Sequence, residues 1–342
     1  MEDIKDFGLE ELKESLLNKG YPRFLARQVF SWIYGKRIED FSLMTDISRK
    51  ARKFLENNFY ISGLKLLEKE TSIDGTEKFL FRLRDNSTIE TVLIPEGKRN
   101  TLCISTQVGC RFRCAFCVSG INGFKRNLKS SEITGQYLEV SRFKKTKPVT
   151  NIVFMGIGEP LDNFDNLVKS IGILTDPSGI SLGKKRICVS TVGIIPELKE
   201  LIALNLGVKL SVSLHSADAF KREKLMPIAK KYPLDELIKV VKDFCRKIKV
   251  PLTFEYILIG KVNSSRQDAL KLAKLTKNIN CKVNIIPYNP SSYFKWLKPS
   301  SEEIEGFSDV LRKYNLLFTL RKPKGWDINA ACGQLRAKFG CK

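Results

Sequence analysis

Histidine is almost missing from this chain, because its 342 residues include a single one, His215. Ser-His-Asp and Cys-His nucleophile systems each need a histidine beside the nucleophile, so only a site around His215 could use that chemistry. His215 stands at the end of a predicted strand. We interpret it as a hydrogen-bonded polar residue without an acid–base role.

Long apolar runs and secretory features are missing too. No run approaches the ~20 apolar residues that a membrane-spanning helix needs. The first residues, MEDIKDFGLEELKESLL, are acidic and amphipathic and lack the basic start and apolar centre of a signal peptide. We therefore expect a cytoplasmic protein without membrane contact. We also expect a monomer, since no spare amphipathic stripe indicates a partner chain.

Acidic residues are few relative to basic ones, with 37 Asp and Glu against 59 Lys and Arg and a formal net charge of +22. Solubility needs far less charge, so a polyanionic partner is indicated, and nucleic acid is the leading candidate. A lysine-rich solvated surface, as in heat-adapted proteins, is the alternative. The nine cysteines are odd in number and unevenly spaced, which favours metal binding or thiol chemistry over a disulfide framework.

Periodicity divides the chain into four parts. Residues 1–60 carry three amphipathic helical patterns and predict a small helical domain, and residues 61–97 alternate with period two and predict an antiparallel β extension. Residues 98–325 form the core, and residues 326–342 form a tail. The helical domain has a basic face suited to phosphate contacts. Its members are Arg23, Arg27, Lys36, Arg37, Arg49, Lys50, Arg52 and Lys53.

The core alternates short apolar runs with helical patterns, which predicts an α/β fold with a parallel sheet. A flat doubly wound sheet and an open (βα)6 barrel both satisfy the alternation, and periodicity does not separate them. The six runs are TLCISTQ, NIVFMG, RICVST, VKLSVSL, LTFEYIL and KVNIIP.

Three cysteines follow the first of these runs, in CRFRCAFCVSG, with the spacing C-x3-C-x2-C. A structural zinc site needs four ligands, so zinc would require a distant fourth cysteine. An iron–sulfur cluster held by Cys110, Cys114 and Cys117 would leave one iron open to a small-molecule ligand. Three buried inert thiols are a poor interpretation, because this short segment also contains two arginines and a turn.

This loop resembles the cysteine loop of the radical S-adenosylmethionine (SAM) superfamily. The resemblance implies a [4Fe-4S] cluster whose open iron is chelated by SAM, and reductive cleavage of SAM to a 5′-deoxyadenosyl radical. It also implies a partial (βα)6 radical-SAM barrel, to which the helical domain and β extension are added. The segments FMGIGEP, VSTVG, SLHS and IPYNP are similar to the SAM-contacting strand ends. They implicate Gly158, Glu159, Ser190, Ser213, Leu214, His215 and Asn289.

The tail segment INAACGQL, together with TLCISTQVGC, GFKRNL and FMGIGEPLDN, resembles the RlmN/Cfr group of radical-SAM RNA methyltransferases. The resemblance implies that one SAM methylates Cys332. It implies that a second SAM generates a radical on that methyl group, and that the carbon then joins an adenine in a protein–RNA crosslink. Cys103 is implied to resolve the crosslink and to end in a disulfide with Cys332.

Two further expectations concern side chains around these cysteines. Glu90 matches the group's proposed proton acceptor, although by sequence alone a glutamate on the solvent face of a strand is the simpler interpretation. Cys103 needs thiolate character to attack, and the nearby Arg99 and Arg111 are the cations that could lower its pKa. Lys125, Arg126 and the segment RFKKTK, residues 142–147, are candidate RNA contacts at the barrel rim.

The resemblance is closer to RlmN than to Cfr. It implies C2 methylation of an adenosine in the peptidyl-transferase region of 23S rRNA, and also of the adenosine 3′ of the tRNA anticodon. The electron donor would be a flavodoxin or ferredoxin. The alternatives are Cfr-type C8 methylation, and a non-catalytic basic RNA-binding factor whose cysteines hold a structural metal.

Overall fold

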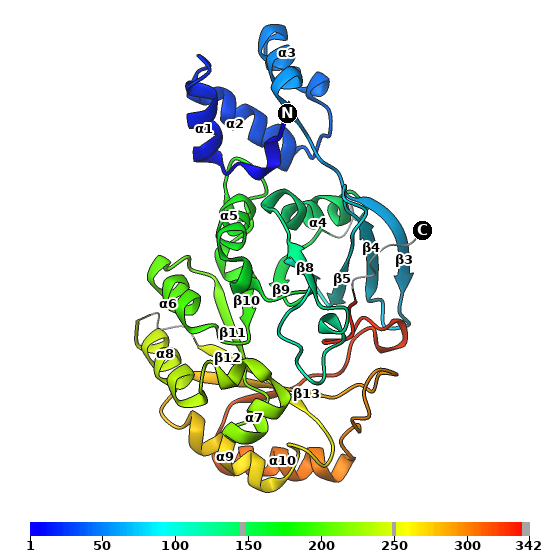
Figure 1. Ribbon diagram of the computed structural model, residues 1–342, viewed down its shortest axis with the longest axis vertical. Helices are drawn as coiled ribbons and strands as arrows, with labels where there is room; N and C mark the ends of the chain where they lie inside the picture. The colour runs from blue at the N-terminus through cyan, green and yellow to red at the C-terminus, as the bar shows by residue number, and fades with distance from the viewer. Residues whose placement is uncertain (144–147, 248–250, 337–342) are drawn as a thin grey trace.

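The N-terminal part of the molecule is a helical lobe above the rest of the chain (Figure 1). The computed structural model describes residues 1–143, 148–247 and 251–336. Part of the candidate segment 142–147 and the end of the predicted tail therefore lie outside the described residues. The lobe contains α1 (Leu9–Leu17), α2 (Arg23–Phe30), a π turn (Ser31–Gly35) and α3 (Arg49–Asn58).

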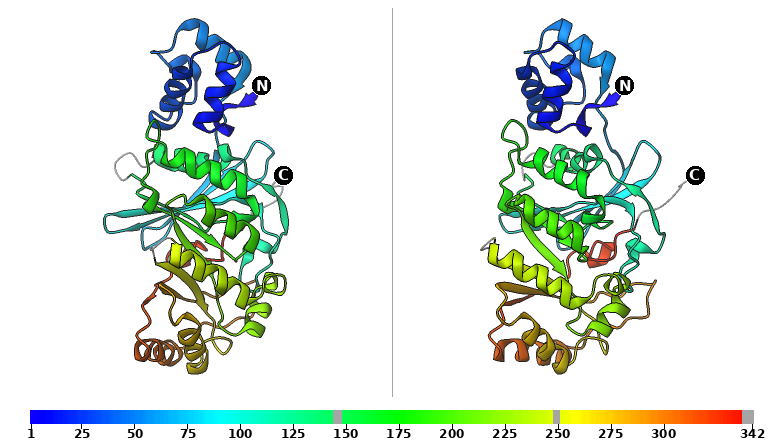
Figure 2. Two further views of the ribbon diagram at one scale, coloured as in Figure 1. Left: turned by 90° about the vertical axis from the view of Figure 1, so that its left-hand side faces the viewer. Right: turned by 60° about the vertical axis from the view of Figure 1, so that its left-hand side comes forward.

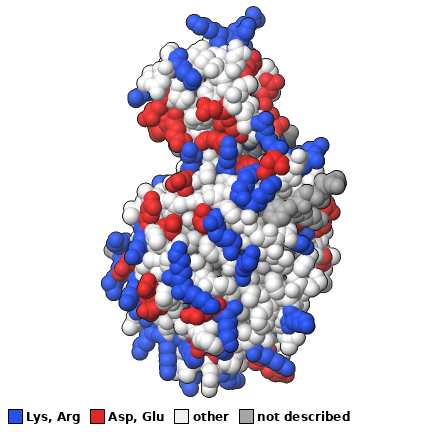
Figure 3. Space-filling view, in the orientation of Figure 1, with Lys and Arg blue, Asp and Glu red and all other residues white. Residues whose placement is uncertain are grey.

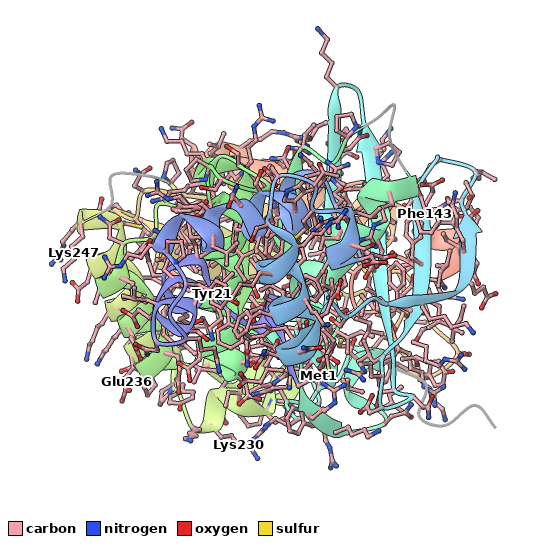
Figure 4. The ribbon with its side chains drawn as sticks, turned by 90° about the horizontal axis from the view of Figure 1, so that it is seen from above. Met1, Tyr21, Phe143, Lys230, Glu236 and Lys247 are labelled. Atoms are coloured by element: carbon pink, nitrogen blue, oxygen red, sulfur yellow. The ribbon has the colours of Figure 1, made fainter. Side chains whose placement is uncertain are left out.

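The predicted helices of this lobe are confirmed, with one change in the second. Pro22 precedes α2, where its fixed φ suits a helix start, and the chain widens into the π turn before Gly35. Tyr21 packs on Phe54 of α3 with ring centroids 4.3 Å apart; Figure 4 looks down on this lobe and labels Tyr21. Short 3-10 turns and a two-residue parallel strand pair complete the lobe. They are η1 (Ile4–Asp6), η3 (Phe41–Leu43), β1 (Glu2–Asp3) and β2 (Phe59–Tyr60).

A ten-stranded sheet spans the described part of the core and the β extension. The extension is antiparallel, as its alternating pattern predicted, and it pairs with the first core strand along one edge. Its strands are β3 (Lys65–Thr71), β4 (Glu77–Arg82) and β5 (Thr88–Glu96). The parallel strands are β6 (Arg99–Cys103), β9 (Asn151–Phe154), β10 (Ile187–Thr191), β11 (Lys209–Ser213), β12 (Leu252–Leu258), β13 (Cys281–Pro287) and β14 (Phe318–Leu320).

Strand order decides between the two architectures that periodicity left open. From β6 to β14 the parallel strands lie side by side in chain order, without a reversal. A doubly wound sheet reverses its order at a switch point, whereas a barrel does not. The fold is therefore the expected partial (βα)6 barrel, and Figure 2 shows its curved sheet from two further sides.

Helices cover one face of the parallel strands, as the views of Figure 2 show. Buried aliphatic residues on these helices and on the strands form one large hydrophobic core that also reaches the N-terminal lobe. Among the described helices, none is long and apolar enough to cross a membrane. The helices of the core are α4 (Ser130–Phe143), α5 (Phe164–Thr175), α6 (Ile195–Leu204), α7 (Ala219–Leu225), α8 (Leu234–Lys247), α9 (Arg266–Thr276) and α10 (Ser301–Lys313).

The run TLCISTQ, expected as one strand, is two. After β6 the chain turns and forms β7 (Gln107–Gly109), which pairs with β8 (Phe124–Asn127) in an antiparallel hairpin outside the main sheet. The three cysteines lie between these two short strands. The hairpin therefore delimits the cysteine loop, a feature that the hydrophobic pattern did not show.

Candidate active site

Most of the expected site residues meet in one cavity at the carboxyl ends of the parallel strands, where ligands bind in open α/β sheets. The cavity has a volume of about 870 Å³, counting its open mouth. The expected residues that line it are Cys110, Cys114, Cys117, Gly158, Glu159, Ser190, Ser213, His215 and Cys332.

Glycines shape the cysteine loop between β7 and β8. Gly109 has a φ of +77°, and a Cβ atom there would lie 2.0 Å from the carbonyl oxygen of Gly123, so no other residue fits. The N–H of Cys110 donates to that same carbonyl over 2.9 Å and closes the base of the loop. A Cβ on Gly120 would lie 3.0 Å from the Cα of Arg113, so the loop is tightly wound.

The three loop cysteines are free thiols. Burial raises the pKa of each, to about 12 for Cys110, so they remain protonated unless a cationic group replaces the proton. Within the described residues, no three Cys, His, Asp or Glu side chains are grouped to hold one metal ion. In a cluster each thiolate binds a different iron, so the sulfurs need not converge on one point. The three cysteines therefore fit an iron–sulfur cluster better than a single zinc ion.

A buried arginine near the loop also fits an anionic group. Arg222 of α7 is 1% exposed, and its Nη2 donates to the carbonyl oxygens of Val192 (2.9 Å) and Ser213 (3.4 Å). Its Nε and Nη1 have no hydrogen-bond partner among the described residues. Burial lowers the pKa of Arg222 to about 10, and the Cys114 sulfur acts in the opposite direction. A buried cation is costly without a nearby anion, which a thiolate-bound cluster would supply.

Glu159 and Gly158 form the turn after β9. Glu159 accepts hydrogen bonds from the N–H groups of Leu161 (3.2 Å) and Val192 (2.9 Å), so its carboxyl connects this turn to the end of β10. Burial raises the pKa of Glu159 to about 7. Gly158 has a φ of +104°, and a Cβ there would lie 2.5 Å from the Cβ of Gln107. The turn thus leaves the backbone of Gly158 open to close approach by a ligand.

His215 is a hydrogen-bonded polar residue, as interpreted from the sequence. Its Nδ1 accepts from the N–H of Ile257 over 3.0 Å, so the neutral ring carries its proton on Nε2. Burial, with the charge of Arg222 beside it, lowers the pKa of His215 to about 3. The ring meets Phe116 edge-on at 4.7 Å between centroids. His215 is therefore an uncharged wall of the cavity at neutral pH.

Two expected SAM contacts lie apart from this cavity. The side chain of Leu214 is fully buried in the main core, and its N–H donates to the carbonyl of Glu255 over 3.0 Å. Asn289 lines a neighbouring cavity, which it shares with Cys332. Asn289 is therefore adjacent to the site, whereas Leu214 could contact a ligand only through its backbone.

The tail reaches the cysteine loop and is fixed to it on the C-terminal side of Cys332. The N–H of Val118 donates to the carbonyl of Gly333 over 2.8 Å, and the Ser119 hydroxyl donates to the carbonyl of Leu335 over 2.7 Å. Cys332 is exposed and lines the main cavity. Its thiol is therefore presented to the same space as the three loop cysteines.

The β extension holds the other side of the tail. The Ser72 hydroxyl donates to the Asp327 carboxylate over 2.5 Å, and the N–H of Ile73 donates to it over 3.1 Å. Lys78 donates to the carbonyl of Ile328 over 2.5 Å. The antiparallel extension thus has a structural role, because it anchors the segment that carries Cys332.

Cys103 also meets Cys332. It is a buried residue on β6, and it lines a smaller cavity together with Cys332 and Cys117. Burial raises the pKa of Cys103 to about 12, and the Cys332 sulfur raises it further. Both cysteines are free thiols. The structure therefore brings together the two sulfurs that were expected to pair.

The cations expected beside Cys103 are engaged elsewhere. Arg99 pairs with Glu96, and Arg111 pairs with Asp162 at 2.9 Å. The arginine that acts on Cys103 is Arg321, which follows β14 and lines the cavity shared by Cys103 and Cys332. The Cys332 sulfur raises the pKa of Arg321, against the effect of burial. The chain separation of more than 200 residues hid this contact from the sequence.

Glu90 does not line the cavity of the cysteines. It faces an adjacent one, where its carboxylate accepts from the N–H of Arg336 (2.7 Å) and lies 3.8 Å from Lys78 Nζ. It is 8% exposed, so the interpretation of a solvent-facing glutamate is wrong. Glu90 holds the tail four residues beyond Cys332.

The expected rim contacts Lys125 and Arg126 are paired with acids. Lys125 lies 3.5 Å from Asp85, and Arg126 lies 2.9 Å from Asp85 and 2.7 Å from Glu132. Hydrogen bonding to Arg126 lowers the pKa of Asp85 well below its usual range. These two cations are therefore poor candidates for phosphate contacts.

A second cavity, of about 1610 Å³, lies toward the opposite, amino-terminal ends of the strands. It shares Met155 and Glu255 with the first cavity, so the two adjoin inside the barrel. Basic side chains dominate its wall, a feature that sequence reasoning missed. They are Arg99, Lys185, Arg186, Lys209, Lys282, Arg321, Lys322 and Lys324, against the acids Glu96 and Glu255.

Comparison with known proteins agrees with this fold and site. The Radical SAM superfamily model matches residues 104–273, which include the cysteine loop and the strand-end turns. The model of the ribosomal RNA large subunit methyltransferase N-terminal domain matches residues 2–61, the helical lobe. The molecule is a radical SAM enzyme, of the class that uses a [4Fe-4S] cluster and SAM.

Full-length relatives narrow the class to one family. Two are named probable dual-specificity RNA methyltransferase RlmN. That of Caldanaerobacter subterraneus subsp. tengcongensis is 43% identical over 99% of both chains, and that of Thermotoga maritima is 43% identical over 99% of this chain and 98% of its own. A radical SAM methyltransferase structure from Sphaerobacter thermophilus superposes with a TM-score of 0.93 at 38% identity, covering 98% of this chain and 99% of that one. The chain belongs to the RlmN family.

Proposed function

We propose that this enzyme methylates C2 of an adenosine in the peptidyl-transferase region of 23S rRNA and of the adenosine 3′ of the tRNA anticodon. The names of its relatives, dual-specificity RNA methyltransferases, support an RNA substrate of two kinds. The observation that carries the proposal is the position of Cys332, whose thiol shares one cavity with the three cysteines of the loop. We further propose that it works in the cytoplasm as a monomer.

We assign separate tasks to the residues of the cavity. Cys110, Cys114 and Cys117 would hold the cluster, and the strand-end residues would hold SAM, with backbone approach at Gly158 and carboxyl contact at Glu159. When bound, the cluster and SAM supply the radical and the methyl group. Arg222 balances buried negative charge beside Cys114.

Cys332 carries the methyl group. C2 of adenine is an electrophilic amidine carbon, so it cannot attack the sulfonium methyl of SAM as a nucleophile. In the first step the Cys332 sulfur instead takes that methyl and loses its proton. The thioether then loses one hydrogen atom to the radical, and its carbon bonds to C2. The unpaired electron that this addition leaves on the adenine would return to the oxidised cluster. The tail anchors at Val118 and Ser119 keep this sulfur at the cavity during both steps.

Cys103 and Glu90 complete the cycle in this proposal. Glu90 accepts the proton from C2 from its place in the adjacent cavity, where the N–H of Arg336 orients its buried carboxylate. The Cys103 thiolate then attacks the Cys332 sulfur, which forms a disulfide and breaks the bond from that sulfur to the product carbon. The electron pair of the broken bond stays with the carbon, which takes up a proton and becomes the methyl group. Their shared cavity supports this pairing. An external two-electron thiol reductant restores both thiols.

The basic cavity at the amino-terminal ends of the strands is where we place the RNA near the adenine. Six of its eight cations form no salt bridge with a described acid and suit phosphates, whereas Arg99 pairs with Glu96 and Lys324 lies 4.0 Å from Asp74. The cavity adjoins the site inside the barrel. An adenine that reaches Cys332 from there must be unstacked. Figure 3 shows further Lys and Arg side chains at the tip of the N-terminal lobe, where α3 lies, and we propose that they contact RNA farther from the target.

Mass spectrometry of nucleosides from rRNA and tRNA treated with reconstituted enzyme tests the proposal. We expect 2-methyladenosine in both RNAs from the wild type, and none from Cys332→Ala with its cluster intact. The C8 isomer in place of the C2 isomer would contradict the assigned carbon. Product in only one RNA would contradict the dual substrate.

A further inference from the structure

The cysteine loop contacts two other segments at Ala115, which lies between Cys114 and Cys117 and is itself partly exposed. Its N–H donates to the carbonyl of Leu225 at the end of α7 over 2.9 Å, and its carbonyl accepts from the indole N–H of Trp296 over 2.6 Å. A cluster held by the loop cysteines would therefore lie next to these two segments.

Three segments therefore form one face. They are the cysteine loop, α7 with the following turn η7 (Pro227–Lys230), and residues 293–298. Their outward side chains are mainly basic, and Glu223 is the single acid among residues 110–117, 219–231 and 293–298. We call this face the cluster-side patch. Its exposed cations are Arg113, Lys224, Lys230, Lys231, Lys295 and Lys298; Arg111 is exposed too, but it pairs with Asp162 and is not counted in the patch.

The six cations of the patch have no acidic partner among the described residues, in contrast to other cations of the loop and of the β7–β8 hairpin. None of the six forms a salt bridge with a described acid, whereas Arg111, Lys125 and Arg126 all do. Lys230 lies at the periphery of the molecule in Figure 4. Unpaired cations on one face leave it positive, which is the condition for attracting an acidic partner.

Apolar side chains lie among the cations. Phe220 is 66% exposed and carries the ammonium of Lys224 over its ring at 4.2 Å, and Leu297 is 53% exposed. An interface of an apolar centre and a charged rim suits protein–protein contact, and small charge-steered interfaces are typical of transient electron-transfer pairs.

We propose that the cluster-side patch docks the acidic one-electron carrier protein, with a flavin or an iron–sulfur centre, that reduces the cluster. This inference rests on the proposed function and adds the surface for its reductant. The step moves one electron from the reduced carrier to the cluster, which oxidises the carrier by one electron and makes or breaks no bond. Tunnelling falls steeply with distance, so the carrier must approach on the side of the molecule where these segments contact the cysteine loop.

The position of the patch leaves room for RNA. The cysteine loop lies at the carboxyl ends of the strands, and the basic cavity lies at their amino-terminal ends. The carrier and the RNA would therefore occupy different faces. An RNA-binding role for the patch is the competing outcome of the test.

Charge reversal tests the proposal directly. The triple variant K224E/K230E/K295E changes three exposed residues outside the catalytic machinery, and R49E/K50E/K53E on α3 makes the same charge change far from the loop. Reduction of the cluster by photoreduced flavodoxin is followed by anaerobic stopped-flow absorbance at low and high salt. We expect the patch variant to lose about tenfold or more of the second-order rate constant at low salt, with less salt dependence. The α3 variant should match the wild type.

Two controls separate the outcomes. Reduction by dithionite, which needs no docking, should be unchanged in both variants, and iron content reports folding and cluster assembly. K224Q/K230Q/K295Q should give a smaller loss than charge reversal. Equal carrier rates in both triple variants would overturn the proposal, as would a patch variant that loses RNA affinity alone. No step of this test uses RNA methylation, so failure of the proposed function would appear separately, as absent methyladenosine with dithionite as reductant.

Discussion

Two charged side chains at the barrel site have buried polar atoms without a hydrogen-bond partner among the described residues. These atoms are two guanidinium nitrogens of Arg222 and one carboxylate oxygen of Glu255. Both lie at the barrel site: Glu255 lines the main cavity, and Arg222 bonds the carbonyls at Val192 and Ser213. Buried polar groups normally find partners, so we attribute these exceptions to bound groups.

Arg222 should raise the reduction potential of the cluster. A buried positive charge favours the added electron, so Arg222→Met should shift the midpoint more negative by at least about 59 mV, a tenfold change for one electron. Electron paramagnetic resonance during redox titration measures this. Arg222→Lys, which keeps the charge, should recover most of the shift. An unchanged potential in Arg222→Met with full iron content would refute this role.

The resolving step should accelerate with rising pH. Burial raises the pKa of Cys103 to about 12, so its reactive thiolate is scarce at neutral pH and grows about tenfold per pH unit below that value. In single turnover, decay of the protein–RNA crosslink should therefore speed up from pH 7 to pH 9. Cys103→Ala should accumulate the crosslink at every pH. A decay rate independent of pH would mean that thiolate formation does not limit the step.

At the scale of elements, the β7–β8 hairpin is the support of the cysteine loop. Gly109 and Gly123 face each other in it with φ of +77° and +73°, but a Cβ meets the backbone only at Gly109. This difference offers a matched pair of substitutions that separates steric overlap from strain in the backbone.

Gly109→Ala should abolish cluster assembly, because its Cβ would overlap the carbonyl of Gly123. Gly123→Ala has open space and should cost only the strain of a left-handed alanine, about 1–2 kcal/mol. Iron content after anaerobic reconstitution and thermal unfolding of each variant measure the two effects. Equal iron content in both variants would show that the hairpin does not determine the conformation of the cysteine loop.

Periodicity predicted most elements but not their arrangement, and the partial (βα)6 barrel was predicted only through the family resemblance. The run LTFEYIL correctly predicted a strand. Its single charged residue, Glu255, was given no role, although a charged residue inside an apolar run indicates a functional position. Periodicity could not supply the strand order that identifies the barrel, or the β7–β8 pairing. The cysteines of the loop were identified by spacing. Arg222, Arg321 and the basic cavity depend on contacts between distant segments, which local patterns do not encode.

At the scale of the whole molecule, we expect only part of the positive charge to contact RNA. The net charge of +22 is spread over many faces, but the basic cavity concentrates eight cations next to the site. RNA that binds in this cavity should release counterions in proportion to the number of phosphates that the cavity cations neutralise. Affinity for an RNA hairpin with the target adenosine should therefore fall steeply with salt.

Removing cavity cations should flatten that salt dependence. Lys209→Ala/Lys282→Ala should lower the slope of log affinity against log salt by about 2, one for each phosphate that is no longer neutralised. Lys125→Ala, whose lysine lies 3.5 Å from Asp85, should leave the slope unchanged. Fluorescence anisotropy at several salt concentrations measures both. Equal slopes in the wild type and the double variant would show that RNA binds at another surface.

The most direct test of the account follows the methyl group through Cys332. Enzyme whose Cys332 has been methylated with trideuteriomethyl SAM is given RNA and unlabelled SAM for a single turnover, and the nucleosides are analysed by mass spectrometry. The account predicts 2-methyladenosine whose methyl group retains two deuterium atoms, since one is removed before the carbon joins C2. Product without deuterium would show that the methyl group never passed through Cys332.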